Sequence, residues 1–329
     1  EAQTMDTLTH TLMGGTLVGL ATIDPNIDAI SAGFIATAVG ASLVPDIDTV
    51  MKMKNNAVYI THHRGITHSL PFTFLIWPVL LTLIAHFAFG LPFLNTYLWV
   101  QLAVFLHVFV DIFNSYGTQA LRPLDNTWIQ LGTINTVDIP ILIVHGLYFV
   151  LWFIGFSPVI LFFIMYAFLI LYYITRYFMQ RFLIRKVDKQ LPNEKIKRTF
   201  VMPTLHFNQW RIIAVTESAY YVGRSFQGNI IFYDRFNRED YLPNEIFMSI
   251  KHDKNFKAFT FFSSIYRYEL TSLNTDTFEL RYIDLRYLKE GHYPFVCIMH
   301  LDKETYEVIH SYTGWVFTED KLQRKLQDN

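Results

Sequence analysis

Long apolar stretches follow one another through the first half of the chain and stop near residue 180. A stretch of roughly 17–25 apolar residues can cross the hydrocarbon core of a bilayer as a helix. We place such stretches at 8–23, 29–48, 69–89, 95–116, 137–156 and 158–180. The first two are rich in Gly and Ala, and the spacing of Gly15 and Gly19 suits close packing between helices. The pattern therefore predicts an α-helical polytopic membrane domain of about six spans.

A different pattern begins near residue 200. Short runs rich in aromatic and β-branched residues are separated by Gly, Asn, Asp and Pro, which is typical of strands joined by turns. We interpret as strands the runs "AYYVGRSF", "NIIFYDRF", "KAFTFFSSIYRYEL", "TFELRYIDLRYL" and "YPFVCIMHL". We therefore expect a small, mostly antiparallel β domain that ends in a short helix at 318–327.

These two patterns divide the chain into three parts. Residues 1–4 precede Met5, which we expect to be the native start, so the membrane domain is assigned to 5–183. A basic linker is assigned to 184–199, and the soluble β-rich domain to 200–329.

Basic residues are concentrated in the second half of the chain. Of the 27 Lys and Arg residues, only Lys52, Lys54, Arg64 and Arg122 precede residue 176. The formal net charge of -1 gives no support for a nucleic-acid partner. The single cysteine, Cys297, excludes an intrachain disulfide.

The basic residues also predict an orientation, because Lys and Arg favour cytoplasmic loops. The last predicted span runs into "TRYFMQRFLIRKVDKQLPNEKIKR", the densest basic run in the chain. This run places the C-terminal domain in the cytoplasm. Counting back through six spans puts the N-terminus and the loops 49–68 and 117–136 on the same side, and these loops carry the four early basic residues. We therefore expect a multi-pass protein with both termini in the cytoplasm.

Ionisable residues are costly inside a bilayer and usually mark a functional site. In the predicted topology they gather at the cytoplasmic ends of the helices, and they are His10, Asp46, Asp48, His63, His68, His107, Asp111 and Asp138. His107 and Asp111 are four residues apart and so lie on one helix face. His63 and His68 are five apart, so we expect one from a loop and the other from the start of the third span. His62 is the second choice to His63.

Imidazoles and carboxylates without a thiolate form the ligand set of a site for one to three divalent ions, with Zn²⁺ favoured and Mn²⁺ as the second choice. The alternative is a buried His–Asp hydrogen-bond network without metal. Four Asp with only Arg64 and Arg122 nearby would leave buried negative charge unpaired, and a divalent cation would balance that charge.

These residues resemble a bacterial family of membrane-bound metal-dependent hydrolases, the YdjM-like group that includes the YfhP-like proteins of Gram-positive bacteria. The resemblance rests on His10, "PDID" at 45–48, "HRGITHS" at 63–69, "HVFVDIFNSYGT" at 107–118 and "VDIP" at 137–140, and it covers roughly residues 5–180. It implies a hydrolase of the bacterial cell membrane with the eight His and Asp residues as its functional set. A more distant likeness to zinc-dependent phospholipase C and P1-type nucleases implies zinc ions held by His and Asp.

We expect metal-assisted hydrolysis at the cytoplasmic membrane surface, because a bound metal lowers the pKa of water and polarises the oxygen under attack. Asp46 and Asp111 would be the catalytic carboxylates, and one or the other would bridge two ions. Arg64 would face a phosphate oxygen or developing charge, and its alternative role is a loop charge that sets topology. A site at headgroup depth favours a phosphoester in a phospholipid or other lipid-linked substrate.

Two other functions fit the same residues. One is a non-catalytic membrane protein with a structural metal site, which protein ligands would saturate, and a C-terminal binding module or dimerisation domain. The other is a transporter, which would need polar residues on both sides of the bilayer midplane. The extracellular halves of the predicted spans are almost wholly apolar, which weighs against a transporter.

Overall fold

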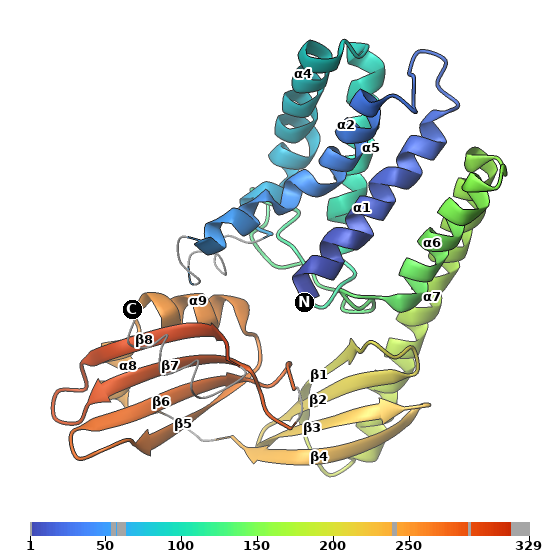
Figure 1. Cartoon of the computed structure of the whole chain (residues 1–329). Helices are drawn as coiled ribbons and strands as arrows, with labels where there is room; N and C mark the ends of the chain where they lie inside the picture. The colour runs from blue at the N-terminus through green and yellow to red at the C-terminus, as the bar shows by residue number, and fades with distance from the viewer. Residues whose placement is uncertain (1, 54–56, 58–63, 239–241, 289–290, 317–329) are drawn as a thin grey trace.

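The computed structural model describes residues 2–53, 57, 64–238, 242–288 and 291–316. Within these residues, the chain forms a bundle of helices followed by two antiparallel β-sheets, which lie beyond one end of the bundle (Figure 1). The predicted order of a helical region followed by a mostly-β region is therefore confirmed. His62, His63 and the predicted helix at 318–327 lie outside the described residues.

The helical bundle contains one helix for each predicted apolar stretch. Its helices are α1 (Ala2–Ala21), α2 (Ala32–Leu43), α4 (Trp77–Phe89), α5 (Phe93–Asp111), α6 (Ile139–Phe153) and α7 (Pro158–Gln190). Shorter helical segments are η1 (Val44–Met53), which continues α2, and η2 (Ile66–His68) and η3 (Phe72–Ile76), which precede α4. Leu17, Val104 and Tyr148 belong to the buried core of the bundle. On the outside, Phe87 and Phe153 are 81% and 93% exposed, as expected for side chains that face lipid.

Not every helix has the length and composition of a membrane span. Among the described residues, four segments do, and they are Ala32–Val50, Phe72–Phe89, Phe93–Asp111 and Pro158–Gln190. α6 is apolar but has 15 residues, whereas a spanning helix needs about 20. α1 has 20 residues but carries Asp6, His10 and several Thr, and it is not among the four. The described residues of this region thus form six α-helices, but six crossings are not confirmed.

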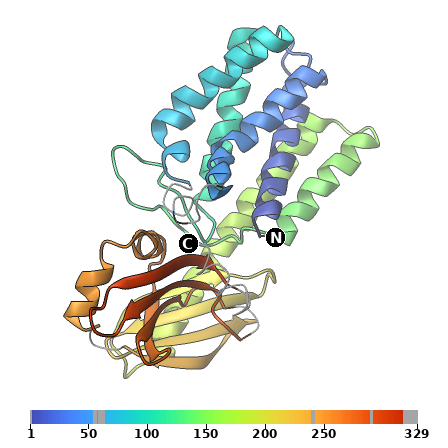
Figure 2. The same cartoon turned by 60° about the vertical axis from the view of Figure 1, so that its left-hand side comes forward.

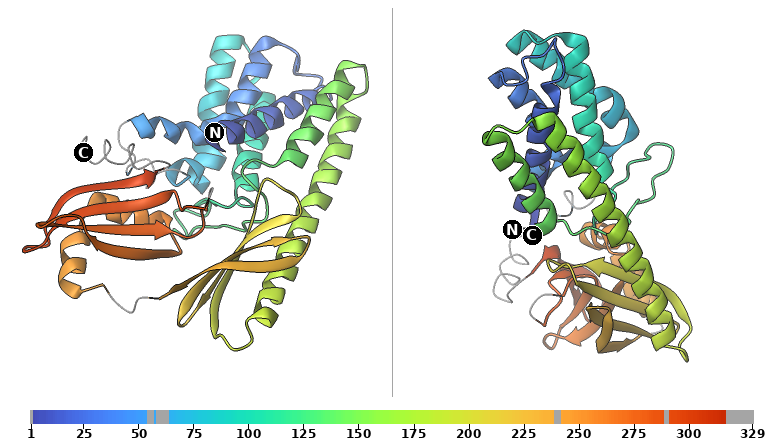
Figure 3. Two further views of the ribbon diagram at one scale, coloured as in Figure 1. Left: turned by 60° about the horizontal axis from the view of Figure 1, so that its bottom comes forward. Right: turned by 90° about the vertical axis from the view of Figure 1, so that its right-hand side faces the viewer.

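α7 differs from the prediction because it does not end with its apolar part. Its 33 residues rise about 50 Å, which exceeds a hydrocarbon core of about 30 Å. Figure 3 shows it continuing along the first sheet, where Leu183 and Val187 are buried in one cluster with Trp210. The range 184–199, predicted as a basic linker, therefore holds the end of α7 and the start of a strand, joined by 191–195. Its basic residues surround an apolar stripe on a helix.

Both sheets are four-stranded antiparallel meanders. The first has the order β1 (Ile196–Pro203), β2 (Gln209–Thr216), β3 (Ala219–Phe226) and β4 (Asn229–Asn237). The second has the order β5 (Tyr266–Ser272), β6 (Thr277–Asp284), β7 (Phe295–Asp302) and β8 (Val308–Trp315). The sequence had predicted β3, β4, β6 and β7 but not β1, β2 or β8. Figure 2 shows the two sheets on the same side of the bundle.

Two helices, α8 (Asn244–Ile250) and α9 (Lys254–Phe262), lie between the sheets in sequence. α9 corrects the prediction of one strand over "KAFTFFSSIYRYEL", which is a helix followed by β5. Asp253 caps this helix by accepting from the backbone N–H groups of Asn255 and Phe256 at 2.8 and 2.9 Å. Phe259 is buried and stacks on Phe295 of β7 with ring centroids 5.7 Å apart. Helical spacing of apolar residues thus outweighed their high strand propensity.

The bundle and the second sheet meet through aromatic side chains. Tyr116, in the loop between α5 and α6, has its ring centroid 6.0 Å from that of Phe262 and 5.9 Å from that of Tyr287. Trp128, from the same loop, packs edge-on against Phe261 at 5.9 Å. The loop that follows α5 is therefore held between the helices and the β region.

Candidate metal centre

Ionisable side chains from four separate parts of the helical region meet at the end of the bundle that faces the sheets (Figure 1). They are His10 of α1, Asp46 and Asp48 of η1, His68 of η2, and His107 and Asp111 of α5. The helix ends carry these residues to one place although more than a hundred positions separate the first from the last.

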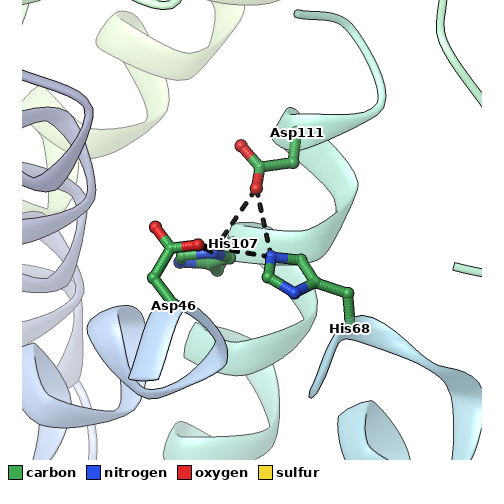
Figure 4. A group of neighbouring side chains, drawn as sticks. All are labelled: Asp46, His68, His107 and Asp111. Carbon is green, nitrogen blue, oxygen red and sulfur yellow. Dashed lines mark hydrogen bonds and ion pairs between the residues drawn. The ribbon is translucent and has the colours of Figure 1, made fainter. Parts of the chain in front are cut away.

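Asp46, His68, His107 and Asp111 form the centre of this cluster, which we call the four-residue group (Figure 4). One ligand atom from each residue lies within 4.8 Å of the other three. Nε2 of His68 is 3.3 Å from Oδ2 of Asp111 and 3.6 Å from Oδ1 of Asp46. Nε2 of His107 is 3.5 and 3.7 Å from the same two oxygens. Ligand atoms in a tetrahedral zinc site are roughly 3.3–3.4 Å apart, given bonds of about 2.0–2.1 Å. The four distances between histidine and aspartate atoms are thus close to those that one ion requires.

His107 is oriented by a backbone contact with α2. Its Nδ1 lies 2.6 Å from the carbonyl oxygen of Ser42, and a carbonyl oxygen can only accept, so Nδ1 carries a proton. In the neutral ring, Nε2 then holds a lone pair that points at the carboxylates. Within the described residues neither Nε2 of His107 nor Oδ1 of Asp46 has a hydrogen-bond partner. Histidines that bind metals commonly donate their other N–H group to a carbonyl in this way.

His68 is oriented by Asp48 through Thr67. The Thr67 hydroxyl donates its single hydrogen to Oδ2 of Asp48 at 2.8 Å, so its oxygen accepts from Nδ1 of His68 at 3.1 Å. Nε2 of His68 therefore also presents a lone pair to the four-residue group. Burial lowers the pKa of His68 and so favours the neutral form that binds metals. Asp48, a predicted ligand, lies behind His68 and outside the four-residue group.

Asp111 is fixed by donors on the oxygen that faces away from His68. Its Oδ1 accepts from Nδ2 of Asn114 at 3.1 Å and lies 3.4 Å from both a guanidinium nitrogen of Arg64 and Nε2 of His10. These contacts leave Oδ2 directed at the two histidines of the four-residue group. The ring of His10 stacks on that of His107 with centroids 3.7 Å apart. His10, another predicted ligand, thus adjoins the group through Asp111 and His107.

Arg64 is buried beside the group, with 2% of its surface exposed. Its φ of 57° lies in the left-handed region, which residues other than glycine rarely adopt. Its backbone N–H donates to Asp48 at 2.9 Å, and its carbonyl accepts from the Thr118 hydroxyl and the Gln119 N–H at 3.1 Å each. The surrounding chain therefore holds this conformation in place. The guanidinium of Arg64 is thus buried beside Asp111. The alternative interpretation of Arg64 was a loop charge that sets topology.

Asp138 lies outside the four-residue group and takes part in a different set of contacts. The Tyr172 hydroxyl lies 2.9 and 3.0 Å from its two carboxylate oxygens. Asp138 also caps α6 by accepting from the backbone N–H of Ile141 at 3.4 Å. The structure thus gives this predicted ligand a place at the start of a helix, where it anchors α6 to α7.

The four-residue group is closed except at Asp46. His68, His107 and Asp111 are at most 1% exposed, whereas the side chain of Asp46 is 18% exposed. Two carboxylates beside one guanidinium, Arg64, leave one net negative charge while the imidazoles are neutral. A divalent cation fits this donor set of two imidazole nitrogens and two carboxylate oxygens. The exposed side of Asp46 is where a further ligand could approach it.

Comparisons with known proteins identify the family of the chain. The family model of the YdjM inner membrane protein matches residues 5–183, that of the YfhP middle domain 192–236, and that of the YfhP C-terminal alpha/beta plait domain 245–326. The chain is 46% identical over 328 residues to the uncharacterized protein YfhP of Bacillus subtilis (strain 168). The match covers 98% of this chain and 99% of that protein. No solved structure matches the chain. The predicted likeness to the YdjM and YfhP proteins is therefore confirmed, and the chain belongs to the YdjM inner membrane protein family.

Proposed function

We propose that this protein is a membrane-embedded metal-dependent hydrolase that cleaves a phosphoester of a lipid or lipid-linked substrate at the cytoplasmic face. The observation that carries the proposal is the approach of two imidazole Nε2 atoms, from His68 and His107, to carboxylate oxygens of Asp46 and Asp111 at 3.3–3.7 Å. Lone pairs and carboxylates repel unless a proton or a metal ion lies between them. The hydrogen bonds on both Nδ1 atoms turn the Nε2 atoms toward the carboxylates, and histidines that bind metals are commonly oriented in this way.

Zn²⁺ is the ion that this donor set suits best, with Mn²⁺ as the second choice, because imidazole and carboxylate ligands without thiolates serve both. When bound, the ion would supply an activated water and a Lewis acid for a phosphoryl oxygen. Asp46, as the exposed member of the four-residue group, is the carboxylate that would meet substrate and accept a proton from the attacking water. Asp111 would hold its geometry through contacts with Asn114, His10 and Arg64.

Arg64 is the residue that favours a phosphoester among hydrolysable bonds. Its planar guanidinium can bind two phosphate oxygens at once, and it would stabilise charge that develops during cleavage. The lipid part of the substrate is inferred from the surroundings. Phe105 and Phe109, on the same helix as His107, are 38% and 45% exposed on the bundle. An acyl or prenyl chain could lie along such a surface while its headgroup reaches the four-residue group.

The cytoplasmic location rests on the basic residues near the ends of the helices. The four-residue group lies at the end of the bundle that faces the β-sheets, and α7 carries Arg181, Arg185, Lys186 and Lys189 beyond that end.

The retained alternative is a non-catalytic protein with a structural metal site and a C-terminal binding module. Four protein ligands would saturate one such ion.

The experiment that separates these functions is a hydrolysis assay on the full chain purified in detergent. The purified chain is depleted of metal with a chelator, reloaded with Zn²⁺ or Mn²⁺, and offered phospholipid and polyprenyl-phosphate substrates. The hydrolase proposal expects release of phosphate or phosphorylated headgroup only from the reloaded chain, with Asp46→Asn inactive. His145→Gln is the matched control, because this buried histidine of α6 lies outside the four-residue group. A chain that binds metal and cleaves none of these substrates would leave the structural alternative.

A further inference from the structure

A cavity of about 600 Å³ is lined by residues of the first sheet and of the start of the second. Both sheets lie beyond the end of the helical bundle (Figure 1). Residues from β1, β3, β4 and β5 line the cavity, and four of them are arginines: Arg198, Arg235, Arg238 and Arg267. Among the described residues that line it, none is an Asp or a Glu. We call this cavity the arginine groove. Its volume is in the range of pockets that bind small molecules.

The arginines of the groove are held by aromatic rings. The guanidinium carbon of Arg198 lies 4.1 Å from the ring centroid of Phe200, and that of Arg267 lies 4.3 Å from that of Phe236. Arg238 lies over Tyr220 at 5.6 Å. A ring below a guanidinium occupies its flat face and leaves the N–H edge free to bind an anion. The side chains are thus ordered before any ligand arrives, which lowers the entropy lost on binding.

Carboxylates in the described part of the chain neutralise only some of this charge. Arg267 pairs with Glu269 at 2.6 Å, and Arg235 donates to the Tyr221 hydroxyl, which in turn donates to Glu194. Arg238 donates to the backbone carbonyl of Thr216 at 3.1 Å and has no ion pair there.

Arg198 has no hydrogen bond or ion pair to any residue that the structure describes, apart from its contact with Phe200. The pKa of Arg198 is lowered, first by burial and then by the charge of Arg286. Arg198 and Arg238 therefore line one cavity, and within the described residues neither has a carboxylate partner. An anion bound there would be attracted by both positive charges.

We propose that the arginine groove is a binding site for a phosphate-bearing anion, with Arg198 and Arg238 as its principal ligands. Phosphate suits the site because a guanidinium donates two parallel hydrogen bonds to its oxygens. The aromatic and aliphatic lining, including Tyr266 and Ile265, would contact the rest of the molecule. The anion would be either a free phosphorylated molecule or a lipid headgroup. This site is separate from the four-residue group and does not depend on the proposed hydrolase function.

The first test uses inorganic pyrophosphate and isothermal titration of the full chain in detergent. His68→Ala serves as the background, so that a metal centre cannot bind the probe. We expect binding that weakens as salt is added, and a loss of at least about tenfold in affinity in Arg198→Ala/Arg238→Ala. Arg224→Ala is the matched control, because Arg224 is an exposed arginine of β3 that does not line the groove. The Arg198→Lys/Arg238→Lys variant keeps both positive charges and should lose less affinity for pyrophosphate. It serves as a second variant in case the double alanine variant fails to fold.

The second test distinguishes a lipid headgroup from a free anion. The same proteins are placed in nanodiscs of phosphatidylcholine with or without phosphatidic acid, and thermal unfolding is followed. A headgroup ligand predicts a higher unfolding midpoint with phosphatidic acid that disappears in the double alanine variant, whereas a free anion predicts pyrophosphate binding alone. If neither probe acts on the parent chain, or if the double alanine variant responds like Arg224→Ala, the proposal is wrong.

Discussion

Nδ1 of His107 lies 2.6 Å from the backbone carbonyl oxygen of Ser42, so α2 determines which nitrogen of a histidine on α5 can bind a metal. The carbonyl accepts a hydrogen bond from the Nδ1–H group, so in the neutral ring the Nε2 lone pair is directed at Asp46 and Asp111. The same helix continues into η1, which carries Asp46. One turn of chain thus supplies both a ligand and the group that orients another ligand.

The hydroxyl of Thr67 should matter for metal binding although it is not a ligand. In Thr67→Val, His68 loses the acceptor of its Nδ1 proton and Asp48 loses a donor. Loss of such an orienting partner typically lowers metal affinity by roughly 10–100-fold. Competition with a chelator measures this affinity in the purified chain.

Thr82→Val is the control for that substitution. Thr82 is fully buried, whereas Thr67 is half-buried, and the Thr82 hydroxyl has no hydrogen-bond partner among the described residues. Its replacement should leave metal affinity unchanged. Equal affinity in the two variants would contradict the role given to Thr67.

Arg64→Lys should separate substrate binding from metal binding. Lysine keeps a positive charge beside Asp111 but cannot donate two parallel hydrogen bonds to a phosphate. We expect metal content close to that of the parent chain and a hydrolysis rate lower by about 100–1,000-fold. The rate is measured on the lipid substrate found in the hydrolysis assay. A variant with full activity would show that the guanidinium has only a structural role.

The second sheet should lose stability in acid through Glu279. His300 lies 3.2 Å from its carboxylate, and this contact, together with the charge of Arg281, outweighs the opposing effect of burial and leaves the pKa of Glu279 below its ordinary value of 4.5. Because the folded pKa is the lower one, the stabilisation is complete above about pH 4.5 and is lost as pH falls through the folded pKa. The thermal unfolding midpoint of the parent chain should therefore decrease as the pH is lowered below about 4.5. The Glu279→Gln variant should be less stable than the parent chain near neutral pH, and its stability should depend less on pH in acid. If the variant has the same pH profile as the parent chain, Glu279 does not have this role.

The sequence was sufficient to bring the four-residue group together. His107 and Asp111 share a helix face, and the ends of the apolar stretches place Asp46 and His68 at the same depth. Sequence could not separate these ligands from Asp48 and Asp138. All of them are carboxylates or imidazoles at helix ends, and their roles depend on which neighbour each one contacts.

The contacts that orient the ligands left no signal in the sequence. The acceptor for His107 is the backbone carbonyl of Ser42, and every residue has such a carbonyl. Thr67 is part of the "GITHS" run, but nothing in that run shows that its hydroxyl joins Asp48 to His68. The extent of α7 was missed for a related reason. Its basic residues are typical of a loop, and the stripe that includes Leu183 and Val187 has a partner only once the first sheet has formed.

The most direct test of the central claim is the metal content of the full chain, purified in detergent without chelator and measured by elemental mass spectrometry. We predict about one Zn²⁺ or Mn²⁺ per chain, lost in both Asp46→Asn and His68→Ala and retained in His145→Gln, while near-UV circular dichroism shows that all the variants remain folded. A folded parent chain without zinc or manganese would contradict the account, and would leave protonated histidines paired with Asp46 and Asp111 in a buried polar network.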